Sequence, residues 1–288
     1  MFRAEIGILG GSGLYQMPGI EKVDRQQIST PFGEPSDWLT FGELRGRKVV
    51  FLARHGRNHH LLPSDINYRA NIYAMKQSGV TAILSISAVG SLKEEHRPGR
   101  FVVPDQFIDR TYARRSTFFG PDIVAHVAMG DPVCPEVGSA MMTACGNSGV
   151  EATRGGTYVC MEGPQFSTRA ESNLYRSWGA DVIGMTNWQE AKLAREAEIC
   201  YGTLAMVTDY DCWHPGHDSV TTEQIVQVLN QNSAAALKVL DAAVAALPVK
   251  RNCKCQSALK NAILTQPSAV SEKTRQTLHL LLDKYFRA

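Results

Sequence analysis

The 288-residue chain lacks the features of several specialised classes of protein. No apolar run approaches the roughly 20 residues that cross a bilayer, and the first residues lack a basic stretch followed by a long apolar one. The 30 basic residues barely exceed the 28 acidic ones, so there is no surplus of positive charge to neutralise a nucleic acid. We therefore expect a cytoplasmic protein that binds neither membranes nor nucleic acids.

Cysteine is irregularly spaced. The seven cysteines form no CxxC pair and no Cys/His group at zinc spacing, which argues against a disulfide framework and against a structural metal site. Cys253 and Cys255 flank a single lysine, and two interpretations stay open for them: free thiols near a loop, or a strained and reducible disulfide. Most of the others are expected to be small buried residues.

Several common catalytic motifs are also missing. The glycines that follow Leu9 do not complete a GxGxxG pattern, because Gln16 stands at the position of the last glycine. The Walker, HExxH and GxSxG patterns are absent as well. These absences weaken the cases for a dinucleotide-binding protein, a metalloprotease and a serine hydrolase.

The sequence does contain short apolar, β-rich segments that alternate with segments of helical periodicity. Its 44% of hydrophobic residues are enough for a large core. Strands are expected over 4–9, 48–53, 80–88, 100–107, 156–161, 181–185 and 201–208, and helices over 67–78, 169–178, 189–198, 222–247 and 271–286. This order predicts an α/β fold, a single domain over 1–288 with a central mixed β-sheet flanked by helices. The stretch 248–255 is the linker-like segment between the two C-terminal helices.

Polar groups stand where several predicted strands end. Ser12 lies in a glycine-rich loop, Arg54 and His55 follow the second strand, and Ser87 with Ala88 closes the third. Arginine offers a planar fork of donors, and hydroxyl, imidazole and backbone amide groups add further ones, so together they suit a phosphate-sized anion. Taken singly, each also fits a solvated corner or a tight turn.

A series of ordered motifs carries a family resemblance from Ile6 to about Leu240. In chain order they are IGILGGSGL, TPFGEPS, LARHGRNH, NYRANI, DQFIDRT, EGPQFSTRAES, WGADVIGMT and TDYDCW. On these motifs the chain resembles the trimeric purine nucleoside phosphorylases, most closely those that act on 5′-methylthioadenosine. The resemblance implies the nucleoside phosphorylase fold and the phosphate-dependent cleavage of 5′-methylthioadenosine into adenine and 5-methylthioribose 1-phosphate, a transferase reaction of purine and methionine salvage.

The resemblance also implies a set of site residues. Phosphate would be a co-substrate held by Ser12, Arg54, His55, Ser87, Ala88 and Thr186. Met185 would contact the ribose, and Phe166 and Ser167 would lie beside the purine. Asp209 and Asp211 would face N7 and the exocyclic amine of the base. The 5′ substituent would be bound by Thr222, His126 and Leu280. Asp209 would be the catalytic residue, sharing a proton with N7 as the purine leaves. No metal and no organic cofactor is needed.

His126 and Leu280 would come from a neighbouring subunit, so a homotrimer is implied. Two positions depart from the family pattern. A proline that relatives usually carry is absent from the segment Asn187–Gln189, so the helix start and, through Trp188, the ribose wall are expected to differ. Thr222 adds a hydroxyl where selective relatives have an apolar residue, which makes rejection of adenosine less strict.

Two other functions compete. A phosphorylase for 6-oxopurine nucleosides, inosine or methylthioinosine, is the nearest alternative, but the carboxylate of Asp209 would face a 6-oxo group lone pair to lone pair. A nucleoside-binding module without turnover would not need the anion site. Asp209 and Asp211, taken alone, would also fit a helix cap or an Asx turn.

Overall fold

The computed structural model describes residues 2–14, 16–215 and 222–286, and of residues 222–226 the backbone alone. Its strands are β1 (Ile6–Gly10), β2 (Glu21–Gln26), β3 (Leu39–Leu44), β4 (Arg47–Ala53), β5 (Ala82–Ser91), β6 (Phe101–Val103), β7 (Gln106–Arg110), β8 (Ala152–Arg154), β9 (Thr157–Met161), β10 (Val182–Gly184) and β11 (Cys200–Asp209). Its helices are α1 (Tyr68–Gln77), α2 (Pro135–Asn147), α3 (Arg169–Ser177), α4 (Asn187–Glu196), α5 (Thr222–Ala246), α6 (Glu272–Thr277) and α7 (His279–Phe286), with short 3₁₀ turns η1 (Lys254–Ser257) and η2 (Pro267–Ala269).

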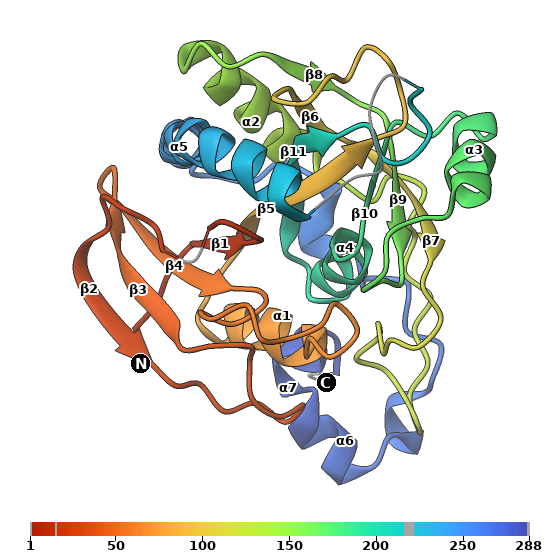
Figure 1. The fold of residues 1–288 in the computed structure, drawn as a ribbon. Helices are drawn as coiled ribbons and strands as arrows, with labels where there is room; N and C mark the ends of the chain where they lie inside the picture. Colours follow the sequence, from red (N-terminus) through yellow and green to blue (C-terminus); the bar gives the residue numbers. More distant parts are fainter. Residues whose placement is uncertain (1, 15, 216–221, 287–288) are drawn as a thin grey trace.

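The strands form one mixed sheet that branches at β5 (Figure 1). Its main path runs β2-β3-β4-β1-β5-β10-β9-β7, and β11 pairs with β5 and carries β6 and β8 beyond it. The strands β4, β1, β5 and β11 are parallel neighbours, with Gly10 beside Ala53 and Met206 beside Ala88. Parallel strands end at one edge of the sheet, so the residues after them come together there.

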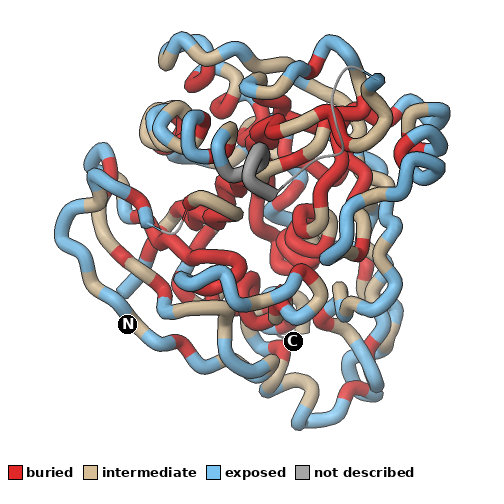
Figure 2. Tube along the Cα trace, in the orientation of Figure 1, coloured by how far each residue is buried: buried red, intermediate tan, exposed pale blue. Residues whose placement is uncertain are grey.

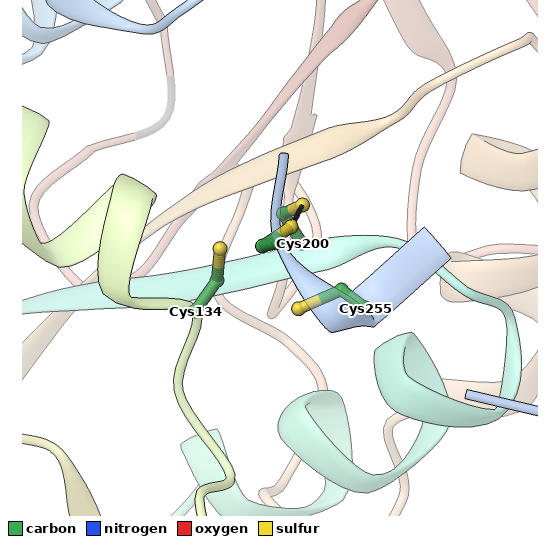
Figure 3. A group of neighbouring side chains, drawn as sticks. Cys134, Cys200 and Cys255 are labelled. Carbon is green, nitrogen blue, oxygen red and sulfur yellow. Dashed lines mark hydrogen bonds between the residues drawn. The ribbon is translucent and has the colours of Figure 1, made fainter. Parts of the chain in front are cut away.

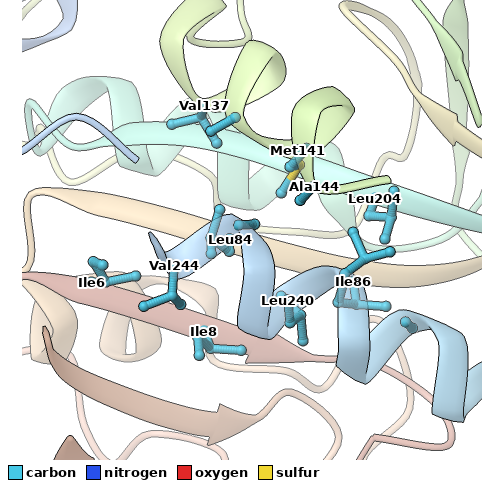
Figure 4. Packing of buried hydrophobic residues seen from close by; sticks show 14 of the residues in the cluster. Ile6, Ile8, Leu84, Ile86, Val137, Met141, Ala144, Leu204, Leu240 and Val244 are labelled. Atoms are coloured by element: carbon cyan, nitrogen blue, oxygen red, sulfur yellow. The ribbon is translucent and has the colours of Figure 1, made fainter. Parts of the chain in front are cut away.

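Helices cover both faces of this sheet. On one face α2 and α5 pack against side chains such as Ile8, Leu84 and Leu204 (Figure 4). On the other face α1, α4 and α7 pack against side chains such as Leu9 and Ile83. Because successive residues of a strand point to opposite faces, a strand covered on both sides is mostly apolar along its length. Buried polar residues in these strands, such as Ser85 and Thr203, are hydrogen-bonded. Figure 2 shows the resulting buried centre of the sheet.

The predicted central mixed sheet with flanking helices is confirmed. The helix predicted over 67–78 is α1, which is capped by Asn67, whose side chain accepts from the amide of Ala70, and by Ser78. The segment 100–107 is split by Pro104 into β6 and β7, which belong to different branches of the sheet. Of the helices that the structure describes, none combines the length and the apolar character that a membrane span needs.

The prediction of one helix over 271–286 is wrong, because α6 ends at Thr277 and α7 begins at His279. The Tyr73 hydroxyl donates to the carbonyl of Thr277 at 2.9 Å, and the His279 ring nitrogen Nδ1 donates to the carbonyl of Gln276, also at 2.9 Å. These side-chain bonds occupy carbonyls that a continuous helix would pair with its own amides. Leu278, at the break, is buried in the core.

Four elements had no sequence prediction: β2, β3, α2 and β8. Strand β2 is an edge strand with the sequence EKVDRQ, and most of its residues are exposed, so it lacks an apolar face. Helix α2 contains Gly138, Gly146 and Cys145, which are poor helix formers. It forms because its Val137, Ala140 and Met141 are buried against the sheet, so tertiary packing overrides weak propensity here.

Candidate active site

The polar strand ends meet at one cavity. It has a volume of about 550 Å³ and opens at the carboxyl edge of β1, β4, β5 and β11. The predicted site residues that line it are Ser12, Arg54, His55, Ser87, Ala88, Phe166, Met185, Thr186, Asp209 and Asp211. Residues separated by up to two hundred positions in the chain therefore share one pocket of a size suited to a small ligand.

Arg54 is buried at the inner end of this cavity, with 1% of its surface exposed. Its Nε and Nη2 form a bidentate ion pair with the carboxylate of Glu190, and Nη2 and Nη1 also donate to Ser85 Oγ (2.6 Å) and to the carbonyl of Ile86 (3.0 Å). Burial disfavours the charged form, but the Glu190 carboxylate outweighs it and raises the pKa of Arg54. These bonds use four of the five guanidinium N–H groups, which leaves one at Nη1 for a ligand.

Gly11 is needed beside this arginine. A Cβ atom built on Gly11 would lie 2.7 Å from Arg54 Nη1 and 2.6 Å from the carbonyl oxygen of Ile86. Any other residue would therefore push the guanidinium away from the glycine-rich loop. The sequence Gly10–Gly13 thus brings the backbone and Ser12 next to a buried positive charge, which suits an anion.

His55 is neutral in this environment. Burial lowers the pKa of His55 to about 4, with smaller contributions from Arg54 and His59. Its Nδ1 lies 2.9 Å from the carbonyl oxygen of Leu61, and because a carbonyl only accepts, Nδ1 carries the hydrogen. Nε2 of the neutral ring is then an acceptor, which matches the hydroxyl of a hydrogen phosphate ion rather than its bare oxygens.

Two hydroxyl groups complete this end of the cavity. Ser87 is buried, and its Oγ lies 3.4 Å from the Tyr158 hydroxyl. Thr186 precedes α4, but its side chain makes no capping hydrogen bond to that helix. Its hydroxyl therefore remains available at the N-terminus of a ten-residue helix, where backbone amides also favour an anion.

Two aspartates occupy another part of the cavity wall. Asp209 accepts from the Thr208 hydroxyl at 2.6 Å and from the amide of Asp211 at 2.7 Å. Burial raises the pKa of Asp209 to about 6 in spite of these two bonds, and burial also raises the pKa of Asp211. The hydroxyl groups of Ser167 and Ser172 lie near the Asp211 carboxyl group, but its buried Oδ2 atom makes no well-aligned hydrogen bond within the described residues. The backbone φ of Asp211 is +52°. Burying an acceptor without a hydrogen bond costs free energy, and so does this rare backbone conformation. Both features point to a ligand that donates a hydrogen bond to Asp211.

The remaining wall is largely apolar. Met161, Val89, Ile183, Met185 and Leu229 line it. Phe166 also lines the cavity and is 51% exposed, so its ring is available to a ligand. Such surfaces fit the faces of a planar base and an apolar substituent.

Of the other predicted site residues, Ser167, His126 and Leu280 do not line the cavity, and the side chain of Thr222 is not described. Ser167 is next to the lining residue Phe166, and its carbonyl accepts from the Cys212 thiol at 3.3 Å. His126 is bonded through its amide to the carbonyl of Ala262, and Leu280 packs against the core beneath α1 and α4. Neither contributes to the cavity of its own chain. Thr222 is the first residue of α5, and its side chain lies outside the described residues.

The segment Asn187–Gln189, which lacks the proline of its relatives, was expected to change the ribose wall through Trp188. Helix α4 starts at Asn187, whose buried side-chain NH₂ group lies within hydrogen-bond distance of the hydroxyls of Ser85, Tyr201 and Thr203 and shares its two hydrogens among them. Trp188 does not line the cavity and packs instead on Phe107, with ring centroids 5.2 Å apart. The expected change to the ribose wall is therefore not found.

Several residues of the site had no sequence prediction. His59 and His60 line the cavity, and the consecutive histidines that follow the LARHGRN motif were the available signal. Glu190, the counter-ion of Arg54, lies 136 positions away along the chain and carries no local signal. Arg114 is buried in a loop, where its guanidinium donates to the carbonyls of Glu162 and Met185 and so positions two segments of the wall.

Comparison with known proteins agrees with this geometry. The family model for the phosphorylase superfamily matches residues 5–245. A relative from Koribacter versatilis, named S-methyl-5′-thioadenosine phosphorylase, is 64% identical and covers 99% of this chain and 97% of its own length. A relative of the same name from Geobacter sulfurreducens is 55% identical, covering 97% and 98%.

Solved structures agree as well. A methylthioadenosine phosphorylase from an antarctic soil metagenomic library superposes with a TM-score of 0.93 at 50% identity, covering 98% of this chain and 100% of that one. The methylthioadenosine phosphorylase from Schistosoma mansoni in complex with adenine has a TM-score of 0.85 at 35% identity, covering 90% and 96%. The chain therefore belongs to the phosphorylase superfamily and, within it, to the family of the S-methyl-5′-thioadenosine phosphorylases.

Proposed function

We propose that this protein cleaves 5′-methylthioadenosine with inorganic phosphate, giving adenine and 5-methylthioribose 1-phosphate. The observation that carries the proposal is a single cavity that holds Arg54 and its neighbouring hydroxyls together with the buried pair Asp209 and Asp211. The names of the relatives from Koribacter versatilis and Geobacter sulfurreducens support the same substrate.

Phosphate is the co-substrate at the strand ends. Cleavage of the N-glycosidic bond builds positive charge on the ribose, and a phosphate dianion beside it stabilises that charge before attacking the anomeric carbon. Ser12, Ser87 and Thr186 hold the anion with the remaining N–H of Arg54 and the amide of Ala88. His55 Nε2 accepts from the phosphate hydroxyl. The reaction uses no metal and no organic cofactor.

The purine leaves toward the aspartates. Negative charge grows on the base, and a proton shared between Asp209 and N7 neutralises it. A pKa of about 6 keeps a useful fraction of Asp209 protonated near neutral pH, and the Thr208 hydroxyl and the Asp211 amide hold its carboxyl group in place. The unpartnered Oδ2 of Asp211 accepts from the 6-amino group.

The 5′-methylthio group binds in a pocket completed by a neighbouring subunit. His126 and Leu280 contribute nothing to the cavity of their own chain, so in a homotrimer they serve the next one. Sedimentation or light scattering should report about three times 31.6 kDa. A stable, fully active monomer would contradict this arrangement. The enzyme acts in the cytoplasm, in purine and methionine salvage.

One assay tests the whole proposal. The protein is incubated with methylthioadenosine, adenosine, methylthioinosine and inosine, each with and without phosphate, and the base and sugar products are separated. We expect methylthioadenosine to react fastest and only with phosphate. Free methylthioribose formed at full rate without phosphate would indicate hydrolysis, and a preference for inosine or methylthioinosine would indicate the 6-oxopurine alternative.

A further inference from the structure

Four cysteines that are dispersed in the sequence meet in the fold, away from the nucleoside cavity. Cys134 directly precedes α2, Cys200 begins β11, and Cys253 and Cys255 lie at η1. Their sulfur atoms all lie within 4.8 Å of one another. Figure 3 shows Cys134, Cys200 and Cys255 turned toward one space between these elements.

The spacing matches a tetrahedral thiolate site. Zinc binds cysteine sulfur at about 2.3 Å, so the sulfurs of a tetrahedral site are about 3.8 Å apart. The sulfurs of Cys200 and Cys253 are 3.2 Å apart, and the others fall within the 4.8 Å limit. The observed separations therefore bracket the value that a tetrahedral zinc site requires.

Positive charge surrounds the cluster. Arg251 Nη1 lies 3.9 Å from Cys200 Sγ and also donates to the carbonyl of Glu198 at 2.9 Å, which fixes the guanidinium in place. Thiolates are the form that binds metal, and nearby cations stabilise them.

The cluster can be reached from solvent. A second cavity, with a volume of about 450 Å³, is lined by Cys134, Cys253 and Cys255 along with Arg154 and Arg195. Cys134, Cys200 and Cys255 are buried, and Cys253 is half-buried at this opening. None of the four cysteines lines the nucleoside cavity.

We propose that Cys134, Cys200, Cys253 and Cys255 bind one zinc ion as a closed, structural site. Four soft sulfur ligands in a compact group favour zinc over magnesium or calcium, which prefer oxygen. The four thiols release four protons on binding, and the resulting ZnS₄ group carries two negative charges, which Arg195 and Arg251 offset. The ion joins the segment after α5, which has little regular structure, to β11 and to the start of α2.

Metal content and cobalt substitution test this site. The wild-type chain, purified with a phosphine reductant and without chelators, should contain about one zinc ion per chain by mass spectrometry. Replacement by Co²⁺ should give the charge-transfer and ligand-field absorption of a tetrahedral cobalt thiolate. Both measurements are independent of enzyme activity.

Two variants and a control separate binding from folding. Cys253→Ala removes the half-buried ligand, and Cys134→Ala removes a fully buried one. Either variant should lower the affinity for zinc at least about a hundredfold, because losing a ligand costs more than the roughly 10–100-fold loss of affinity that follows when a residue hydrogen-bonded to a ligand is removed. Cys145→Ala removes a buried thiol of α2 outside the cluster and should keep the zinc. Circular dichroism and phosphorolysis of all three confirm that they are folded.

Three results on metal binding would overturn the proposal. They are a fully reduced wild type that takes up less than about a tenth of an ion per chain, folded Cys253→Ala and Cys134→Ala proteins that retain zinc, and a cobalt spectrum without thiolate bands. A Cys200–Cys253 or Cys253–Cys255 disulfide that persists in place of zinc after reduction and zinc addition would also overturn it.

Discussion

Replacing Asp209 by asparagine tests whether this carboxyl group delivers the proton that the departing purine needs. The amide of Asp211 donates to Asp209 Oδ1 at 2.7 Å, so the asparagine must place its carbonyl oxygen there. Its NH₂ group then takes the place of Oδ2, beside the Thr208 hydroxyl, which can rotate to accept. The variant is therefore accommodated without an unpaired group, but it cannot donate a proton to N7.

The expected loss follows from this geometry. General acid catalysis is worth about 10²–10⁴-fold, so turnover of methylthioadenosine should fall by about a hundredfold or more. N7 and the substituent at C6 are neighbours on one edge of the purine, so the NH₂ group at position 209 can also donate to a 6-oxo group. A correct or missing hydrogen bond at a buried site is worth about 1–3 kcal/mol. The preference for methylthioadenosine over methylthioinosine should therefore fall by roughly ten- to a hundredfold.

The assay is the ratio of kcat/KM for the two nucleosides from pH 5 to 9. Burial raises the pKa of Asp209 from 3.8 to about 6, so its protonated form dominates below pH 6 and declines about tenfold per pH unit above it. Wild-type kcat/KM should decline in the same range, and Asp209→Asn should lack this limb. Asp65→Asn, at an exposed position, is the matched control. An unchanged ratio together with a retained limb would refute the reasoning.

Three further predictions follow from buried charges and from the 5′ pocket. Arg54→Ala should raise the KM for phosphate. It should also lower the free energy of unfolding by about 3–5 kcal/mol, because Glu190 is then buried without its cation, and an unchanged Tm would contradict this. Adenosine should be a poorer but measurable substrate, with kcat/KM lower by about 10–200-fold, because one apolar substituent contributes about 1–3 kcal/mol; equal kcat/KM for both nucleosides would show that the 5′ pocket is wrongly assigned. Burial raises the pKa of Glu196 from 4.5 to about 7. The contribution of protonated Glu196 to the free energy of unfolding is therefore fully present below about pH 4.5 and is lost as pH rises through 7, which lowers the free energy of unfolding by up to about 3 kcal/mol at pH 8. Denaturant unfolding at pH 5 and 8 should show this loss in the wild type and much less of it in Glu196→Gln. An equal change in the free energy of unfolding between the two pH values in both proteins would count against the prediction.

Local patterns predicted the elements that lead into the site. Strands β1, β4, β5 and β11 are largely buried on both faces, so each is a predominantly apolar run that is followed by, or ends at, a glycine or a polar residue. Their ends could be recognised in the sequence because the change from apolar to polar is abrupt. The exposed edge strand β2 has no such contrast, and helix α2 is stabilised by the core that it covers. Neither could be recognised from its own residues.

The sequence by itself therefore determined the α/β order, the polar strand ends and the family motifs, since each of these is carried by neighbouring residues. Tertiary structure alone decided the contacts between distant ones. Glu190 reaches Arg54 across 136 positions, and this pairing leaves the guanidinium one N–H group for a ligand. Cys134 and Cys200 meet Cys253 and Cys255 although no zinc spacing links them. The physical reason is that a buried charge or thiol is stabilised by whatever the fold brings within a few ångströms, and that distance is not encoded in local spacing.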